Sequence, residues 1–371
     1  MFKLHVIQAA FGDCLLLEHG STEDPRLILI DGGPPGTYRK HLRGVLEDQA
    51  AQDRSLDLVM LSHVDADHIT GLVDFFAELR DQASNGGTPL ISAAALWHNS
   101  FSRALDPEST IAPRFAAAIA SATAPNALGV MSHSTAALLG IEQGNTLRVL
   151  AQQLGISIND GFPNQLITTE TSIQAFDLNG LSIQIVGPTQ ANLDALREEW
   201  ERWLDQHEDI ITDAEPGVLA NVDESIPNLS SICVLASTDD RTLLLTGDAR
   251  GDFIIEGLIA TGLLEEGGTF HVDVLKLPHH GSDRNLDADF FRTVTADRYV
   301  VSADGKHGNP DYPTYTWLVE AANEAGRQIE IIATNATPTS ARLLESHPPE
   351  DWGYTLTFMP EDDHHLTVEL A

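Results

Sequence analysis

Cysteine and long apolar runs are scarce in this sequence of 371 residues. The two cysteines, Cys14 and Cys233, both lie inside apolar runs, which favours small core residues in a reducing compartment over a disulfide framework. No run of about 18 apolar residues occurs, so we expect no transmembrane helix. The N-terminus starts as an alternating strand, without the basic head and apolar stretch of a signal peptide. These features predict a cytoplasmic protein with no membrane partner.

Positive charge is also scarce. Lysine and arginine number 21 against 55 acidic residues, which gives a formal net charge of −34. Such a charge repels polyanions at long range and argues against a general nucleic-acid surface. A local anion site remains compatible with it, because bound metal ions invert the potential inside a cleft. An acidic composition is equally typical of a salt-adapted or GC-rich host.

The hydrophobic fraction of 42% is sufficient for a sizeable core. Apolar or alternating runs predict strands at residues 3–8, 13–18, 26–30, 56–61, 181–186, 231–236, 241–246, 272–277, 299–302, 329–333, 354–358 and 366–370. Helical spacing predicts helices at 38–49, 69–82, 114–120, 146–154, 193–209, 252–261 and 317–325. The alternation of the two indicates a layered α/β fold, and a polar turn at 360–363 predicts a terminal hairpin.

Two stretches differ in composition from the rest. Residues from about 100 to 175 are rich in Ala, Gln and Ser, and we interpret them as a helical insertion over the core. Residues from about 190 to 225 are acidic and amphipathic, which suggests a lid or a solvated helix. We therefore expect a single domain over residues 1–371 with these two insertions, either of which offers a surface for a partner protein.

The richest motif follows the predicted strand at 56–61. It reads His63-x-Asp65-x-Asp67-His68, with two imidazoles and two carboxylates within six residues. These polar residues are poorly suited to a hydrophobic core, but they provide four side chains able to bind a divalent cation. The motif therefore predicts a metal-dependent hydrolase.

Four further apolar strands end in polar residues that suit a metal site. A single histidine at a strand end is ordinarily a surface histidine, but five strand ends carrying Asp or His are much harder to attribute to chance. Neighbouring strands bring their ends to one rim, so we expect these side chains to converge. The four segments are Asp31-Gly32-Gly33, Gly247-Asp248, Pro278-His279-His280-Gly281-Ser282 and Lys306-His307-Gly308-Asn309-Pro310.

This ordered set resembles the metallo-β-lactamase fold, and more closely the soluble hydrolase domain of ComEC-type competence proteins. The resemblance covers about residues 1 to 312 and implies a four-layer αββα sandwich. The final segment, 307–310, resembles that family's closing His-Gly-His-Pro. The other matching segments are 11–17, 29–33, 62–68, 228–231, 244–248 and 275–282.

The resemblance implies two divalent metal ions, with Zn²⁺ and Mn²⁺ as the leading candidates. Asp65 stands where many relatives have a histidine, and this oxygen ligand makes Mn²⁺ or Fe²⁺ suitable as well as Zn²⁺. The implied ligands are His63 and Asp65 for one ion, Asp67 and His68 for the other, Asp248 as the bridge, and His279 and His307 to complete the two sites.

Further roles follow from the same resemblance. Asp67 and His280 would be catalytic, with His280 as general acid or transition-state donor, and the choice of ligand between His279 and His280 stays open. Asp31 would orient a ligand histidine from behind. A histidine found near residue 228 in many relatives is absent, so His98 is an alternative ligand. The residues expected to support ligands or to meet an anionic substrate are Asn228, Ser230, Lys276, Ser282 and Lys306.

These features favour a hydrolase that uses a hydroxide bridging two metal ions to attack a phosphodiester or other phosphoryl ester. Its substrate would be a small anionic compound or a short single-stranded nucleic acid. The same chemistry also serves a carboxylic ester, lactone or thioester hydrolase. A metal-stabilised regulatory binding module is the non-enzymatic alternative.

Overall fold

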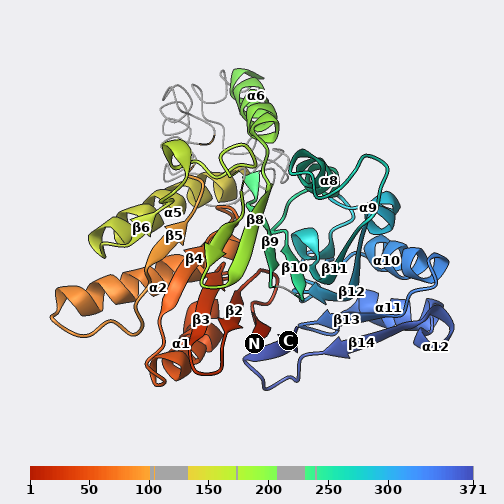
Figure 1. Cartoon of the computed structure of the whole chain (residues 1–371), viewed down its shortest axis with the longest axis horizontal. Coiled ribbons are helices and arrows are strands. Elements are labelled where there is room, and N and C mark those ends of the chain that lie inside the picture. The colour runs from red at the N-terminus through yellow and green to blue at the C-terminus, as the bar shows by residue number, and fades with distance from the viewer. Residues whose placement is uncertain (101–103, 105–132, 173, 207–229, 239, 371) are drawn as a thin grey trace, which may run out of the picture.

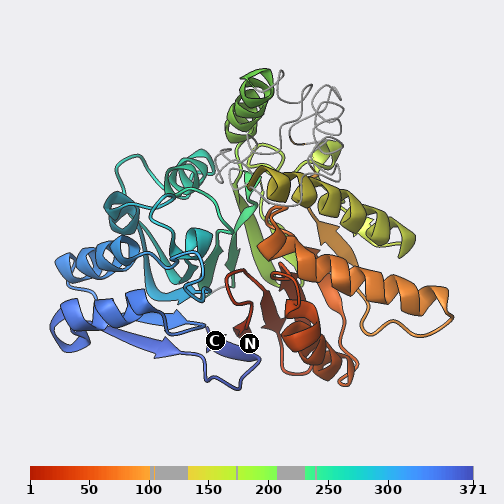
Figure 2. The same cartoon turned by 180° about the vertical axis from the view of Figure 1, so that it is seen from behind.

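Two β-sheets packed face to face, with helices on both outer sides, form the fold of this computed structural model (Figure 1). The structure describes residues 1–100, 104, 133–172, 174–206, 230–238 and 240–370. The predicted four-layer αββα sandwich is confirmed. Strands β1 to β6 form the first sheet together with the C-terminal strand β15, strands β7 to β14 form the second, and both chain ends lie at the junction between the two halves of the molecule (Figure 2).

The first sheet has the strand order β15-β1-β2-β3-β4-β5-β6. Neighbours from β3 to β6 are parallel, whereas β15, β1, β2 and β3 alternate in direction. Parallel β3 and β4 therefore end at the same edge, where the predicted metal motifs begin. The bounds are β1 Phe2–Ile7, β2 Leu15–Gly20, β3 Pro25–Ile30, β4 Leu56–Met60, β5 Ala95–Trp97, β6 Ser157–Ile158 and β15 His365–Glu369.

The second sheet has the order β14-β13-β12-β11-β10-β9-β8-β7, and its neighbours from β10 to β14 are parallel. The ends of β10, β11 and β12 consequently meet at one edge. The bounds are β7 Phe176–Leu178, β8 Leu181–Gly187, β9 Cys233–Ser237, β10 Thr242–Leu245, β11 Phe270–Lys276, β12 Val294–Val301, β13 Ile329–Ala333 and β14 Tyr354–Phe358.

Separate sets of helices cover the outer faces. A π-helical turn, η1 (Tyr38–Leu42), with α1 (Arg43–Ala50), α2 (Ala66–Ser84) and α5 (His133–Gln153) covers the first sheet. The second is covered by α8 (Gly251–Ala260), α9 (Ala288–Thr293), α10 (Tyr312–Glu324), α11 (Pro338–Ser346) and α12 (Pro349–Trp352). Helix α6 (Gln190–Gln206) projects from the top of Figure 1, and η2 (Pro163–Gln165) and η5 (Pro278–Gly281) are short turns. In the described parts of the chain, no helix combines the length and apolar character of a membrane span.

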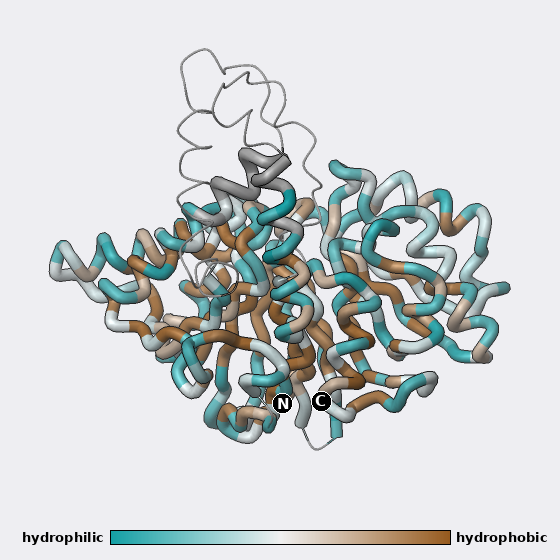
Figure 3. Tube along the Cα trace, turned by 90° about the horizontal axis from the view of Figure 1, so that it is seen from above, coloured by the Kyte–Doolittle hydropathy of each residue, from teal (hydrophilic) through white to brown (hydrophobic). Residues whose placement is uncertain are grey.

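The strands are apolar on both faces because each sheet packs on two layers. In β3, Ile28 and Ile30 face the core between the sheets, whereas Leu27 and Leu29 face the helices. Figure 3 shows the resulting concentration of hydrophobic residues along the central strands. The continuous apolar runs of the sequence are thus explained by a sheet that is buried on both sides.

Part of the first predicted insertion belongs to the layers themselves. Helix α5 packs against α2, and β6 extends the first sheet beside β5. The helical patch predicted at 114–120 lies outside the described residues. In the second predicted insertion α6 covers most of the expected helix at 193–209, and residues 207–229 are outside the described ranges.

The prediction of a terminal hairpin is wrong. Strand β14 pairs in parallel with β13 in the second sheet, whereas β15 pairs antiparallel with β1 in the first. The turn at 360–363 therefore carries the chain from one sheet to the other. Each of the two strands satisfies its backbone hydrogen bonds on a different, more distant partner.

Candidate metal centre

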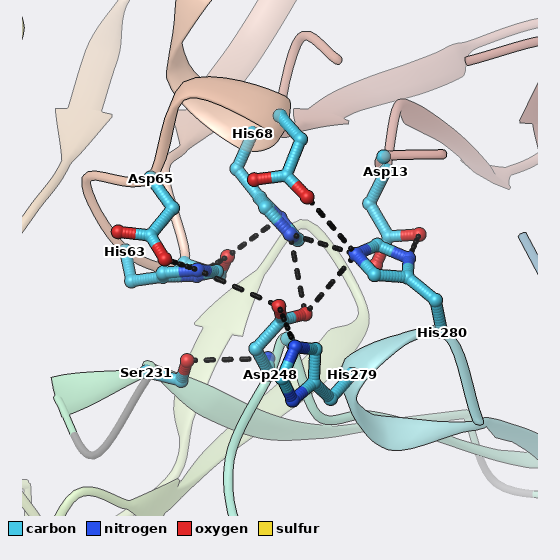
Figure 4. Close-up of polar contacts among 12 residues, drawn as sticks. Asp13, His63, Asp65, His68, Ser231, Asp248, His279 and His280 are labelled. Atoms are coloured by element: carbon cyan, nitrogen blue, oxygen red, sulfur yellow. Dashed lines mark hydrogen bonds and ion pairs between the residues drawn. The ribbon is translucent and has the colours of Figure 1, made fainter. Parts of the chain in front are cut away.

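The motif of residues 63–68 joins the end of β4 to the start of α2 (Figure 4). Helix α2 begins at Ala66, three residues before the predicted start, with Asp65 in an extended conformation at its N-cap. Asp67 and His68 therefore lie on the first turn of the helix, while His63 remains in the loop. Because the chain turns between them, the two imidazoles approach from different directions, and their ring centroids are 4.1 Å apart.

The second sheet contributes three further residues. Asp248 follows β10, and its backbone N–H donates to Ser231 Oγ at 3.2 Å. His279 and His280 follow β11 and both have a positive φ, 46° and 53°. Two consecutive non-glycine residues in this region are uncommon and turn the two imidazoles into the same edge of the molecule.

The carboxylate of Asp248 lies at the middle of the cluster, with two imidazoles facing each oxygen. Oδ1 is 3.2 Å from His68 Nε2 and 3.6 Å from His280 Nε2. Oδ2 is 3.7 Å from both His63 Nε2 and His279 Nε2. The cluster therefore divides into two half-sites that share one carboxylate (Figure 4).

Each half-site has a further carboxylate on its open side. Asp65 Oδ2 is 3.6 Å from His63 Nε2, and Asp67 Oδ2 is 3.4 Å from His280 Nε2. About a quarter of each of these two side chains is exposed, at 23% and 25% respectively. Both half-sites are thus reachable from solvent on the carboxylate side.

The four histidines all have Nδ1 engaged outside the cluster. Two of these contacts come from segments that follow β11 and β12: His279 Nδ1 is 2.7 Å from Asn285 Oδ1, and His280 Nδ1 is 2.9 Å from the Ser302 carbonyl. A carbonyl oxygen only accepts, so the His280 ring donates from Nδ1, and its Nε2 is left facing Asp248. Outer contacts of this kind fix the tautomer of metal-binding histidines.

Asp31 organises the other two histidines through Ser62. Its carboxylate accepts from the Ser62 backbone N–H and Oγ–H, each at 2.7 Å, and lies 2.8 Å from His68 Nδ1. Since the Ser62 hydroxyl proton goes to Asp31, its oxygen accepts from His63 Nδ1 at 3.0 Å. Asp31 therefore lies behind His68 and, through Ser62, behind His63.

A metal ion suits this set of donors. In the described part of the chain, His63 Nε2 and Asp248 Oδ1 are buried without a hydrogen-bond partner. Donor atoms of Asp67, His68, Asp248 and His280 all lie within 4.8 Å of one another. Imidazole nitrogens mixed with carboxylate oxygens are typical ligands of borderline divalent cations such as Zn²⁺ and Mn²⁺.

The charges of the cluster also favour a cation. Burial lowers the pKa of His68, but the carboxylates of Asp248 and Asp31 outweigh it and raise this pKa well above its ordinary value. The same opposition raises the pKa of His280 to about 10, with Asp248 and Asp13 as the main carboxylates. In the absence of metal, protons on these imidazoles compensate the negative charge of the carboxylates. A divalent cation would replace these protons.

Not every predicted site residue lies in the cluster. His307 and Lys306 are exposed at the mouth of the cleft, where both contact Phe11: the His307 ring centroid is 5.2 Å from that of Phe11, and Lys306 Nζ is 3.6 Å from it. In this geometry His280, not His307, completes the half-site of His68. Lys276 is buried and paired with Asp13.

The supporting residues have mixed placements. Ser282 is buried, follows His280 on the same turn and lines the cleft. Ser230 is half-buried beside β9, and Asn228 lies outside the described residues. Asn285, Ser302 and Asp13 were missed as site residues. Only Asp13 had a signal in the sequence, because it lies in the motif at 11–17 that carried the family resemblance.

A cleft of about 430 Å³ opens onto the centre, and its floor includes Asp65, Asp67 and Asp248. Its mouth combines two basic side chains, Arg284 and Lys306, with carboxylates. A cavity of this volume accommodates a small molecule. The mouth carboxylates are Asp283, Asp304 and Asp311.

His98, the alternative ligand, is buried at the end of β5, and both its ring nitrogens lack a hydrogen-bond partner in the described structure. Burial lowers its pKa to about 4. The folded protein therefore binds fewer protons here than the unfolded chain, and stability falls as the pH drops from about 6.5 to about 4.

We expect this histidine alone to cost about 3 kcal/mol of unfolding free energy at the acid end of that range. Urea unfolding of the wild type and His98→Gln at several pH values checks this. Both proteins contain all the other titratable groups, so the difference between their stability curves reports His98 alone. The wild type should lose stability relative to the variant as the pH falls. Parallel stability curves would contradict the prediction.

Comparisons with known proteins bear on the same region. Over 92 residues the chain is 36% identical to Microtubule-associated protein 1A of Rattus norvegicus, an alignment that covers 23% of this chain and 3% of that protein. Residues 9–82 match the model of the Metallo-beta-lactamase superfamily. That match contains Asp31 and the whole motif of residues 63–68. Together with the four-layer fold and the His/Asp cluster, it indicates a metal-dependent hydrolase with a metallo-β-lactamase fold.

Proposed function

We propose that this protein is a metal-dependent hydrolase that cleaves a phosphodiester or another phosphoryl ester. The observation that supports it most is the division of four imidazoles around the two oxygens of Asp248. A shared carboxylate between two such half-sites is the arrangement expected for a pair of metal ions. Two cations bound there would polarise a phosphoryl oxygen and lower the pKa of water.

In this proposal His63, His279 and Asp65 hold one ion, and His68, His280 and Asp67 hold the other, with Asp248 common to both. His280 then acts as a ligand, because its Nδ1 is held by Ser302 and its Nε2 faces the cluster. Asp67 remains the candidate to accept a proton, since its carboxylate borders the open cleft.

The cleft favours a small anionic substrate. Lys306 and Arg284 provide positive charge at its mouth, but the acidic residues beside them limit the attraction of a polyanion. The net charge of −34 acts in the same direction over the whole surface. A nucleotide or another compact phosphoryl ester fits these features better than long duplex DNA.

The alternative of a carboxylic ester, lactone or thioester hydrolase uses the same centre on a carbonyl carbon. The basic side chains at the mouth favour the phosphoryl ester, because a phosphodiester group carries a negative charge and a carboxylic ester, lactone or thioester group carries none. A regulatory binding module would need the cluster without turnover. Its carboxylates open onto a solvent-accessible cleft, which favours turnover.

We expect the purified protein to contain up to two transition-metal ions per chain and to hydrolyse bis(p-nitrophenyl) phosphate. Metal analysis and a parallel panel of phosphodiesters, lactones and thioesters measure both. Removal of the ions with a chelator should abolish hydrolysis, and Zn²⁺ or Mn²⁺ should restore it. Hydrolysis of lactones alone would support the carboxylic ester alternative, and metal-loaded protein inert toward the whole panel would support the binding module.

A further inference from the structure

Asp13 and Lys276 form an ion pair next to the candidate centre, and the proposed chemistry uses neither of them. Lys276 Nζ is 2.7 Å from Asp13 Oδ2, and each residue is only 1% exposed. Lys276 Nζ also donates to the Leu277 carbonyl at 3.0 Å. The lysine therefore lies behind the cluster, away from the cleft where a substrate contact was predicted.

The pair connects the two halves of the fold at the site. Asp13 lies in the turn between β1 and β2, whereas Lys276 is the last residue of β11. The turn is held closely: Asp13 N–H donates to the Asp67 carbonyl at 3.2 Å, and the Gly12 carbonyl accepts from Ser302 Oγ at 2.6 Å. An added Cβ at Gly12 would lie 2.0 Å from the Asp67 carbonyl oxygen, so this turn has little room to shift.

The second oxygen of Asp13 faces His280. Asp13 Oδ1 is buried without a hydrogen-bond partner in the described ranges and lies 3.5 Å from His280 Nδ1. The same Nδ1 donates to the Ser302 carbonyl at 2.9 Å. Two acceptors thus lie on the outer side of this imidazole, opposite the Nε2 that faces Asp248. Figure 4 shows one of them, Asp13, beside the His280 ring.

An ion pair is a costly way to fill a buried space, because both charges lose their hydration. Its advantage here is electrostatic. A carboxylate behind a histidine fixes the ring and increases the basicity of the opposite ring nitrogen, here the Nε2 that faces the cluster. Asp13 alone would add one more negative charge to a cluster that already holds several, and Lys276 cancels that charge without touching the imidazole.

We propose that Asp13 is a positioning residue for His280 and that Lys276 holds Asp13 in place and compensates its charge. This inference rests on the proposed metal centre and adds to it a pair of residues that would set metal affinity from outside the ligand set. Loss of a partner of this kind typically weakens metal binding by about 10- to 100-fold. We expect Asp13→Asn to have an effect of that size on Zn²⁺ affinity.

The experiment compares Asp13→Asn, Lys276→Met and the double variant Asp13→Asn/Lys276→Met in the full chain. Glu18→Gln is the matched control, because Glu18 on β2 is also buried and forms an ion pair, with its Oε1 2.9 Å from Arg54 Nη1. Zn²⁺ affinity is measured by competition with a chromophoric chelator. Urea unfolding of the metal-free proteins reports stability separately.

The double variant separates positioning from a structural role. Replacement of both charges removes the unpaired buried group and should recover much of the stability lost in Lys276→Met. Its Zn²⁺ affinity should nevertheless stay about 10- to 100-fold below that of the wild type, with Glu18→Gln unchanged. The double variant also keeps the test valid if Asp13→Asn alone does not fold.

Two results would overturn this inference and leave the proposed function intact. One is wild-type affinity in Asp13→Asn, and the other is recovery of affinity together with stability in the double variant, which would assign the pair a purely structural role. A wild-type protein that binds no Zn²⁺ would overturn the proposed function, and this inference with it. The two failures are therefore distinguishable in the same set of measurements.

Discussion

Replacing Asp248 with asparagine is expected to weaken metal binding at both half-sites and to reduce hydrolysis by orders of magnitude. Among the residues that the structure describes, this carboxylate is the one group that faces all four imidazoles, with each oxygen directed at a different pair. Asparagine keeps the shape but loses the negative charge and one of the two acceptor oxygens. Loss of a residue that only supports a metal ligand typically lowers metal affinity or activity by about 10- to 100-fold. Loss of a ligand shared by both ions should have a larger effect, on the order of 10³-fold in kcat/KM.

Metal analysis and diester kinetics on the same preparation check this expectation. Asp289→Asn on α9 is a suitable control, since that side chain is 88% exposed and pairs only with a neighbouring arginine on its helix in the described structure. The control should match the wild type in metal content and rate. An Asp248→Asn protein that retains two ions and full activity would show that the shared carboxylate is not the bridge.

Convergence of the motifs could be predicted from the sequence, because it depends on strand direction alone. Asp31 and His63 follow parallel strands β3 and β4, and Asp248 and His280 follow parallel strands β10 and β11. Apolar runs identify such strands, and the polar residues after them mark their ends. Each sheet therefore brings its own residues to one edge before any side-chain contact is known.

The choice among the late histidines could not be predicted in this way. Both His279 and His280 enter the cluster because the backbone at each has a positive φ, a conformation that neither residue type nor spacing reveals. His307 follows its strand at a greater distance and ends at the mouth, against Phe11. Its similarity to a family motif indicated the correct region but not the side-chain position.

Contacts between residues that are distant in sequence could not be predicted either. Periodicity identified β14 and β15 as strands but contained no information about their neighbours, so a local turn signal suggested a hairpin that does not form. The pairing of Asp13 with Lys276 is of the same kind, since it depends on how the two sheets pack together. In both cases the missing information is tertiary.

Replacing Gly71 with alanine is expected to destabilise the folded protein strongly. An added Cβ at Gly71 would lie 1.9 Å from the carbonyl oxygen of Gly32, which is backbone and cannot rotate away. The same contact is fixed by two hydrogen bonds, Gly32 N–H to the His68 carbonyl at 2.7 Å and Gly71 N–H to the Gly33 carbonyl at 3.0 Å. We expect a loss of about 3 kcal/mol or more in unfolding free energy.

Gly44→Ala on α1 is the matched control, because nothing lies within 4 Å of an added Cβ there. Alanine is the better helix former, so this control should gain about 0.5–1 kcal/mol. Urea unfolding of the metal-free proteins measures both changes, and their opposite signs isolate the steric contact from helix propensity. The same clash would move Asp31 away from His68, so folded Gly71→Ala should also bind Zn²⁺ more weakly. Equal stability changes in the two variants would mean that α2 can shift on its loop without cost.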